Sequence, residues 1–215
     1  DFDQTALPID FQWLRSPEPE NFMSLSERPG FLRLKGKESL GSWFEQALVA
    51  RRQQAFRFIA ETRLEFSPTN FQQMAGLVSY YNTHKYLYCF VSVDEGGQRF
   101  FDIMSCEARE DWASTFPLTE GHSGTYRIEE RYKLPADGPV WLRAEVDQQA
   151  LVFSFSTDGS NWNKLPVVLD QSLISDEAGK GEGASFTGAF IGMACQDISG
   201  QDCPADFDYF EYREL

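Results

Sequence analysis

The residues best suited to chemistry lie near the end of the chain. Three carboxylates, Asp206, Asp208 and Glu211, stand in the run DFDYFEY, where acidic and aromatic residues interleave. The alternation slips once, between Tyr209 and Phe210, which predicts a β-bulge at that point. With a bulge there, the three carboxylates share one face of a strand and the neighbouring aromatic residues share the other.

Paired carboxylates on one strand face are the machinery of glycoside hydrolysis. The spacing of Asp206, Asp208 and Glu211 resembles the E-x-D-x-x-E strand of laminarinase-type glycosidases. A retaining mechanism requires two carboxyl groups about 5–5.5 Å apart, with the pKa of the acid raised by its surroundings. The first glutamate of that motif is replaced here by the shorter Asp206, and the motif stands on the final strand. The three residues are therefore catalytic candidates beside a simpler alternative, a solvated carboxylate face on a terminal strand.

Other catalytic chemistry finds little support in the sequence. The two histidines, His84 and His122, are far apart and neither neighbours a cysteine, so we expect no zinc site and no metal or cofactor. No turn has the spacing of an EF-hand, although a calcium site of another kind stays open. The chain has no G-x-S-x-G nucleophile motif and no glycine-rich loop that opens a helix to hold phosphate.

Aromatic side chains offer a second route to sugar recognition, because their flat faces stack on pyranose rings. The candidates are Trp43, Trp112, Trp141 and Trp162. Trp112 is the preferred one, since it lies among acidic and hydroxyl residues rather than in an alternating apolar strand. The alternative for each of them is packing in the core.

Charge and composition narrow the class of partner. The chain has 215 residues, 19 Lys plus Arg against 33 Asp plus Glu, and a formal net charge of −14. Such acidity argues against nucleic acid and anionic membranes and favours neutral ligands. A hydrophobic content of 42% is enough for a substantial core in one domain.

The cysteines and the first residues bear on the compartment. Four cysteines without CxxC spacing are too few for a disulfide scaffold, so we expect a reducing, bacterial cytoplasmic environment. Cys195 and Cys203 flank a short loop and could pair if oxidised. No signal peptide or membrane span is visible, and the missing initiator Met is consistent with a processed product or a fragment of a longer protein.

Alternating apolar and polar residues predict strands through most of the chain. In residues 56–66 the even positions are mostly apolar and the odd ones mostly charged. Further strands are predicted at 31–35, 45–50, 74–80, 86–93, 99–105, 126–132, 140–146, 151–156 and 186–194. A short helical turn is predicted within 171–177, and residues 1–21, with three prolines, should form an extended arm where another domain joins. Turn signals about every ten residues predict a single all-β domain, an antiparallel β-sandwich spanning residues 1–215.

Several ordered segments resemble the C-terminal domain of glycoside hydrolase family 43 β-xylosidases. They are FQWLR (11–15), SERPGFLRL (26–34), LVARRQQ (48–54), FQQMAGL (71–77), YYN (80–82), FTGAFIG (186–192) and PADFDYF (204–210). The resemblance implies a concanavalin A-like sandwich of jelly-roll type. It also implies an N-terminal five-bladed β-propeller, absent from this chain, that carries three catalytic carboxylates and hydrolyses xylosides or arabinofuranosides with inversion.

In that family one loop of the sandwich presents a phenylalanine to the mouth of the propeller's pocket. By motif position this residue resembles Phe186, which follows a flexible glycine-rich segment, 179–185. From the residues alone, Phe186 could equally be a core aromatic at the start of a buried strand. The resemblance favours a substrate-pocket role, and it implies homo-oligomers among the intact enzymes.

These observations lead to one predicted function and two alternatives. The chain is expected to be a non-catalytic accessory domain that packs on the propeller and completes its pocket for xylo-oligosaccharides or arabinofuranosides. The alternatives are a free-standing carbohydrate-binding module and a laminarinase-like glucanase that uses Asp206, Asp208 and Glu211.

Overall fold

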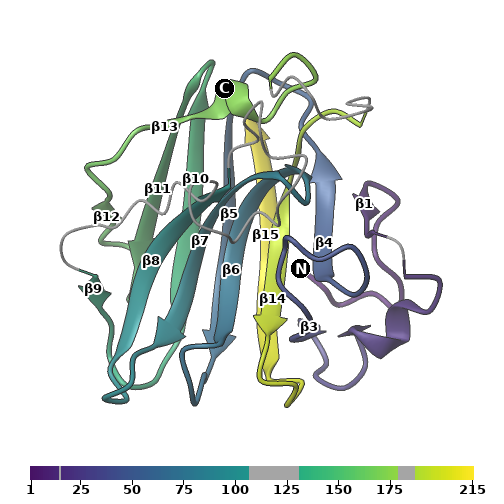
Figure 1. The fold of residues 1–215 in the computed structure, drawn as a ribbon, viewed down its shortest axis with the longest axis vertical. Coiled ribbons are helices and arrows are strands. Elements are labelled where there is room, and N and C mark those ends of the chain that lie inside the picture. Colours follow the sequence, from purple (N-terminus) through teal and green to yellow (C-terminus); the bar gives the residue numbers. More distant parts are fainter. Residues whose placement is uncertain (15, 107–130, 179–186) are drawn as a thin grey trace.

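A computed structural model of the protein describes residues 1–14, 16–106, 131–178 and 187–215. Within these residues the chain forms two antiparallel sheets, whose long strands run along the long axis of the molecule (Figure 1). One sheet contains β1 (Phe11–Gln12), β4 (Ala47–Arg52), β6 (Gln73–Asn82), β7 (Lys85–Val93), β8 (Arg99–Cys106), β9 (Tyr132–Lys133) and β14 (Phe190–Asp197). The other contains β2 (Met23–Ser24), β3 (Leu32–Lys35), β5 (Arg57–Phe66), β10 (Val140–Asp147), β11 (Ala150–Ser156), β12 (Asn163–Lys164), β13 (Leu169–Asp170) and β15 (Pro204–Glu214).

The chain crosses repeatedly between the two sheets. The order of the first sheet is β1-β4-β14-β6-β7-β8-β9, and we call it the β14 sheet. The order of the second is β12-β11-β10-β5-β15-β3-β2, with β13 beside β11, and we call it the β15 sheet. The last two long strands therefore lie inside the sheets, each between strands from much earlier in the sequence. β14 lies between β4 and β6, and β15 lies between β5 and β3. The all-β sandwich predicted from the sequence is confirmed.

The space between the sheets holds the main hydrophobic core. The even residues of β5 alternate inward and are at most 4% exposed, from Phe58 to Phe66, while its odd residues face outward. Phe207 and Ile191, both fully buried, contribute from β15 and β14. Burial of apolar surface at roughly 25 cal/mol per Å² makes this core the dominant stabilising contribution.

The outer face of the β14 sheet is also buried. A second apolar cluster there includes Tyr80, Tyr86, Tyr88, Phe90 and Phe100, each at most 5% exposed. Strands with both faces buried read as continuous apolar runs, which explains the sequence of β7. Within the described residues, most of this face therefore presents packed aromatic side chains, and one small cleft, described below, opens over β4, β6 and β14.

Most predicted strands are confirmed, with boundaries that agree within two residues. Most of the predicted strand 126–132 lies outside the described residues, and β9 begins at Tyr132. The last buried strand begins at Phe190 rather than at residue 186, because Gly188 has a φ of +75°, a left-handed conformation that does not continue a strand. The predicted helical turn is the 3₁₀ helix η3 (Gln171–Leu173).

Two further predictions concern the ends of the chain. The N-terminal arm is not extended throughout, since the 3₁₀ helix η1 (Pro19–Asn21) begins at a proline, and the extended part includes β1, which pairs with β4 at the edge of the β14 sheet (Figure 1). The predicted bulge in β15 is confirmed, because the pairing register with β5 shifts between Phe207 and Phe210, an interval that contains the predicted position. Asp208 and Tyr209, the two residues within this interval, both reach outward, to Arg63 and Glu61 respectively.

Candidate functional site

The three candidate carboxylates share the outer face of β15, as the bulge predicted, but each carboxylate has a different environment. Asp206 is only 6% exposed and receives hydrogen bonds from Arg28 Nη1 at 2.8 Å and from Arg33 Nε and Nη2 at 2.7 and 2.9 Å. Burial alone would raise the pKa of Asp206, but the hydrogen bonds from Arg33 and Arg28 outweigh it and hold the pKa below its ordinary value. Asp206 is therefore held as an anion and is unsuited to donate a proton.

Asp208 and Glu211 also lack the arrangement of a catalytic acid paired with a nucleophile, since each lies beside an arginine. Arg63 Nη1 donates to Asp208 Oδ2 at 2.9 Å, and its Nη2 donates to Glu65 at 2.7 Å. The Glu211 side chain is 57% exposed and lies 3.9 Å from Arg213. This distribution over separate ion pairs favours a structural charge network over catalysis. No group of three or more His, Cys, Asp or Glu side chains in the described residues is arranged to hold a metal ion.

Two of the candidate tryptophans are covered by arginine side chains on the same outer face. The guanidinium of Arg143 lies 3.6 Å from the Trp162 ring centroid, and that of Arg63 lies 5.4 Å from the Trp141 ring. Cation–π stacking of this kind occupies the ring face that a sugar would need. Trp112, the preferred candidate, lies outside the described residues. Trp43 is 47% exposed and remains accessible.

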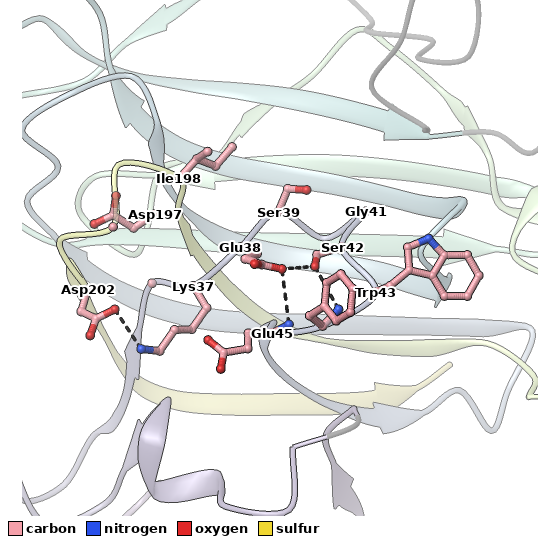
Figure 2. A pocket seen from close by; sticks show the side chains of 13 residues that line it. Lys37, Glu38, Ser39, Gly41, Ser42, Trp43, Glu45, Asp197, Ile198 and Asp202 are labelled. Atoms are coloured by element: carbon pink, nitrogen blue, oxygen red, sulfur yellow. Dashed lines mark hydrogen bonds and ion pairs between the residues drawn. The ribbon is translucent and has the colours of Figure 1, made fainter. Parts of the chain in front are cut away.

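Trp43 belongs to the larger of two hollows whose lining includes a residue predicted to act at a site, or the chain neighbour of one. This groove, with a volume of about 540 Å³, lies between the segment 36–45 and the turn that links β14 to β15. Figure 2 shows Lys37 directed toward Asp202, and Glu38 directed toward Ser42. Phe44, which also lines the groove, is 76% exposed. We call this hollow the Trp43 groove.

The smaller hollow lies at the start of β14, and its lining includes Thr187, the residue that follows Phe186 in the chain. It has a volume of about 200 Å³, and we call it the Trp13 cleft. Its lining residues are Gln12, Trp13, Leu14, Leu48, Ala50, Arg52, Tyr80, Tyr81, Thr187 and Phe190. Phe186 itself lies outside the described residues, but Thr187, the next residue, forms part of the rim. The guanidinium of Arg52 stacks 4.7 Å from the Phe190 ring, and Arg52 donates to the Thr187 carbonyl.

Sequence reasoning did not single out Trp13, Tyr81 or Lys85 as functional residues. Trp13 was visible within one of the motifs that carry the family resemblance, and it is 38% exposed at the cleft. Lys85 had a clearer signal, because a lysine at the start of a strand with both faces buried needs compensating partners. Its partners come from residues 175–178, which no local pattern connects to β7.

Two further features concern membrane-spanning helices and the reactivity of the cysteine thiols. No helix in the described part of the chain is long and apolar enough to cross a membrane. Cys195 and Cys203 are both free thiols, and Cys195 Sγ donates to the Cys203 carbonyl at 3.5 Å. Burial raises the pKa of the Cys203 thiol to about 11, which suppresses its reactive thiolate.

Comparison with known proteins gives a consistent family. The family model described as the β-xylosidase C-terminal concanavalin A-like domain matches residues 1–213. The chain is 43% identical over 213 residues to a xylosidase/arabinosidase 43B from Humicola insolens and 40% identical over 214 residues to a β-xylosidase from Bacillus subtilis, covering 99% and 100% of this chain. It spans only 38% of the length of each of these relatives.

A solved structure agrees with the sequence comparisons. The crystal structure of a xylan β-1,4-xylosidase from Bacillus halodurans superimposes with a TM-score of 0.89 at 37% identity, over 100% of this chain and 38% of that one. The match extends through both sheets and covers the strands that carry the Trp13 cleft. The chain belongs to the family of β-xylosidase C-terminal concanavalin A-like domains.

Proposed function

We propose that this chain serves a family 43 glycoside hydrolase, of β-xylosidase or arabinofuranosidase type, as a non-catalytic domain for handling xylan-derived oligosaccharides. The observation that carries the proposal is the family match over residues 1–213 in a chain that spans 38% of its relatives' length. Those relatives are named xylosidases or arabinosidases. In the proposed enzyme, the catalytic carboxylates belong to the N-terminal propeller, and this sandwich packs against it.

In this proposal the sandwich completes the substrate pocket through Phe186, whose chain neighbour Thr187 lines the Trp13 cleft. The position of Thr187 supports this role, because the residue after Phe186 lies at the cleft rather than in the core between the sheets. An aromatic ring at the mouth of a pocket gives apolar stacking area to a neutral sugar. The domain's net charge of −14 fits a neutral ligand.

Substitution of Phe186 tests the pocket role. In the intact enzyme, we expect Phe186→Ala to lower kcat/KM for a chromogenic xyloside by about 5- to 30-fold, since one aromatic contact contributes roughly 1–2 kcal/mol to binding. Steady-state kinetics measures the effect, and a thermal melt checks that the variant is folded. Phe56→Ala, which removes an aromatic ring that is 80% exposed elsewhere, is the matched control. Unchanged kinetics in folded Phe186→Ala would remove Phe186 from the site.

The intact enzyme is also proposed to be a homo-oligomer. Exposed apolar side chains outside the two hollows, including Phe71 at 53% and Val168 at 60%, give this domain surface that a second subunit could cover. Light scattering of the intact enzyme decides the point. A monomer at micromolar concentration would exclude this part of the proposal.

A carbohydrate-binding module is the second candidate function, and the Trp43 groove is the observation that favours it. Phe44 and Trp43 are 76% and 47% exposed beside the carboxylates of Glu38 and Glu45, which can accept hydrogen bonds from sugar hydroxyls. Calorimetry of the isolated chain with xylo-oligosaccharides tests it. Binding that disappears in Phe44→Ala would support this candidate, and absence of heat at millimolar ligand would eliminate it.

The glucanase alternative has less support from the geometry. It requires Asp206, Asp208 or Glu211 to act as a general acid, whereas Asp206 is held ionised by two arginines. Glucanase activity of the isolated chain, abolished by Glu211→Gln, would be needed to establish it.

A further inference from the structure

The chain on the two sides of residues 179–186 is tied to one hairpin of the β14 sheet. On the N-terminal side, the Lys85 ammonium donates to the Ser175 carbonyl at 3.1 Å and to the Ala178 carbonyl. Lys85 is 1% exposed, and its ammonium lies 4.2 Å from the ring centroid of Tyr81, on the neighbouring strand. The last described residue before the segment is therefore fixed to the start of β7.

The C-terminal side is tied to the same place. The backbone N–H of Thr187 donates to Tyr81 Oη at 3.3 Å, and Thr187 Oγ1 donates to the Tyr81 carbonyl at 3.4 Å. The Tyr81 hydroxyl in turn donates to Asp176 Oδ1, which also accepts from Gly188 N at 3.3 Å. A single carboxylate oxygen thus joins the chain before residue 179 to the chain after residue 186. We call Tyr81, Lys85 and Asp176 the loop anchor.

Packing alone does not explain these residue types. A lysine ammonium taken out of water is unfavourable unless it is fully hydrogen-bonded, and an aliphatic side chain would fill the same volume without that desolvation cost. The Asp176 residue is exposed, so its carboxylate contributes no core packing. What the three side chains do share is that each one holds an end of the same segment.

The loop anchor lies at the Trp13 cleft. Tyr81 and Thr187 line that cleft, as does Arg52, which donates to the Thr187 carbonyl. We infer that Tyr81, Lys85 and Asp176 are positioning residues, which hold the rim of the cleft in the geometry that the substrate pocket of the intact enzyme requires. This inference rests on the proposed function, since it assigns a supporting role to the same pocket.

The test is steady-state kinetics of the intact enzyme on a chromogenic xyloside with variants that remove single contacts. Tyr81→Phe removes the hydroxyl and keeps the ring beneath Lys85, and Asp176→Ala removes an exposed carboxylate. We expect each to raise KM about 5- to 10-fold with kcat changed less than about twofold, as for a loss of uniform binding through misplacement of a pocket rim. Asp176→Asn keeps the Oδ1 acceptor and should restore KM to within about twofold of the parent.

Two controls make the result specific. Tyr209→Phe removes a tyrosine hydroxyl on the outer face of the β15 sheet, where it donates to Glu61, and should leave KM unchanged. The double variant Tyr81→Phe with Phe186→Ala should be no worse than Phe186→Ala alone, because both changes act through one rim. Thermal melts show whether each variant is folded.

The outcomes separate this inference from the proposed function. If Phe186→Ala raises KM while folded Tyr81→Phe and Asp176→Ala do not, the positioning role is overturned and the pocket role stands. If Phe186→Ala has no effect, the pocket role fails. An equal rise in KM for Asp176→Asn and Asp176→Ala, or additive effects in the double variant, would also overturn the positioning role.

Discussion

At the scale of single residues, Asp206 shows how a side chain that looks catalytic in the sequence can be structural. Its two oxygens are occupied by Arg28 and Arg33, and those arginines also contact Glu65 and Glu27. The ring of Phe31 lies 3.8 Å from the Arg28 guanidinium, so the network is partly covered. Asp206 therefore connects β15 to β3 and to the loop before β3.

Removal of the Asp206 carboxylate should destabilise the fold strongly. We expect Asp206→Ala to lower the free energy of unfolding by about 2–3 kcal/mol, because two partly buried arginines lose their buried partner and keep only the more exposed Glu65 and Glu27. Asp208→Ala, which removes a carboxylate that is 35% exposed, should cost less than about 1 kcal/mol. Urea unfolding of the isolated chain measures both, and equal losses for the two variants would contradict the assignment.

The same carboxylate gives stability a defined pH dependence. The pKa of Asp206 is lower in the folded state than in the unfolded chain, so its contribution is present above the unfolded value of about 3.9 and is lost as pH falls through the folded value. The free energy of unfolding should therefore decline in this acidic window, and the decline should be shallower in Asp206→Ala. Parallel profiles for the two proteins would show that Asp206 does not contribute.

At the scale of elements, β14 depends on glycine for its close fit against β4. A Cβ built at Gly192 would lie 2.3 Å from Ala50 Cα and 2.3 Å from the Val49 carbonyl oxygen, and both of these atoms are backbone. Gly192 faces the second apolar cluster, where no space exists for a methyl group. The sequence predicts a strand over 186–194, and the structure identifies the neighbouring strand, β4, that requires a glycine within it.

Substitution at Gly192 should therefore separate the two strands. We expect Gly192→Ala to lower the stability by at least about 2–3 kcal/mol and the Tm by roughly 5–10 °C, as overpacking does. Gly96→Ala, whose nearest neighbour would be Asp94 Oδ1 at 3.3 Å in an exposed turn, is the control and should change Tm little. A Gly192→Ala protein as stable as the parent would mean that β14 can move away from β4 without cost.

The elements were predictable to a much greater degree than the site. Alternation in β5 and continuous apolar runs in β7 follow from local burial, so a period of two in the sequence reports them directly. The loop anchor joins Lys85 to Ala178, and the charge network joins Arg28 to Asp206, pairs that only the topology brings together. Phe186 and Trp112 lie outside the described residues, so their predicted roles remain predictions.

At the scale of the whole molecule, the described residues form a sandwich of two sheets in which the candidate carboxylates stand in separate ion pairs. On its surface, the rim of the Trp13 cleft is held by hydrogen bonds that Thr187 makes with Arg52 and with Tyr81. A cleft of about 200 Å³ is small for a sugar chain. This small volume is consistent with the proposal that the cleft forms one part of a composite pocket.

The isolated domain should therefore be inactive by itself. We expect the chain alone to give no turnover of a chromogenic xyloside, because the acid and base that glycoside hydrolysis needs belong to the proposed propeller. Addition of the separately produced propeller should restore activity, measured as release of the chromophore. Turnover by the isolated chain would contradict the accessory role.

The crossing of the chain between the sheets also has a consequence for synthesis. Within this domain β14 and β15 are the last long strands to be synthesised, yet each occupies an interior position in its sheet, beside partners such as β4 and β3. Neither sheet can close until almost the whole domain has emerged, and such non-local pairing makes folding slow. During that interval the strand edges of β5 and β6 have no neighbour on one side, and an N-terminal domain that folds earlier would be the first surface available to shield them.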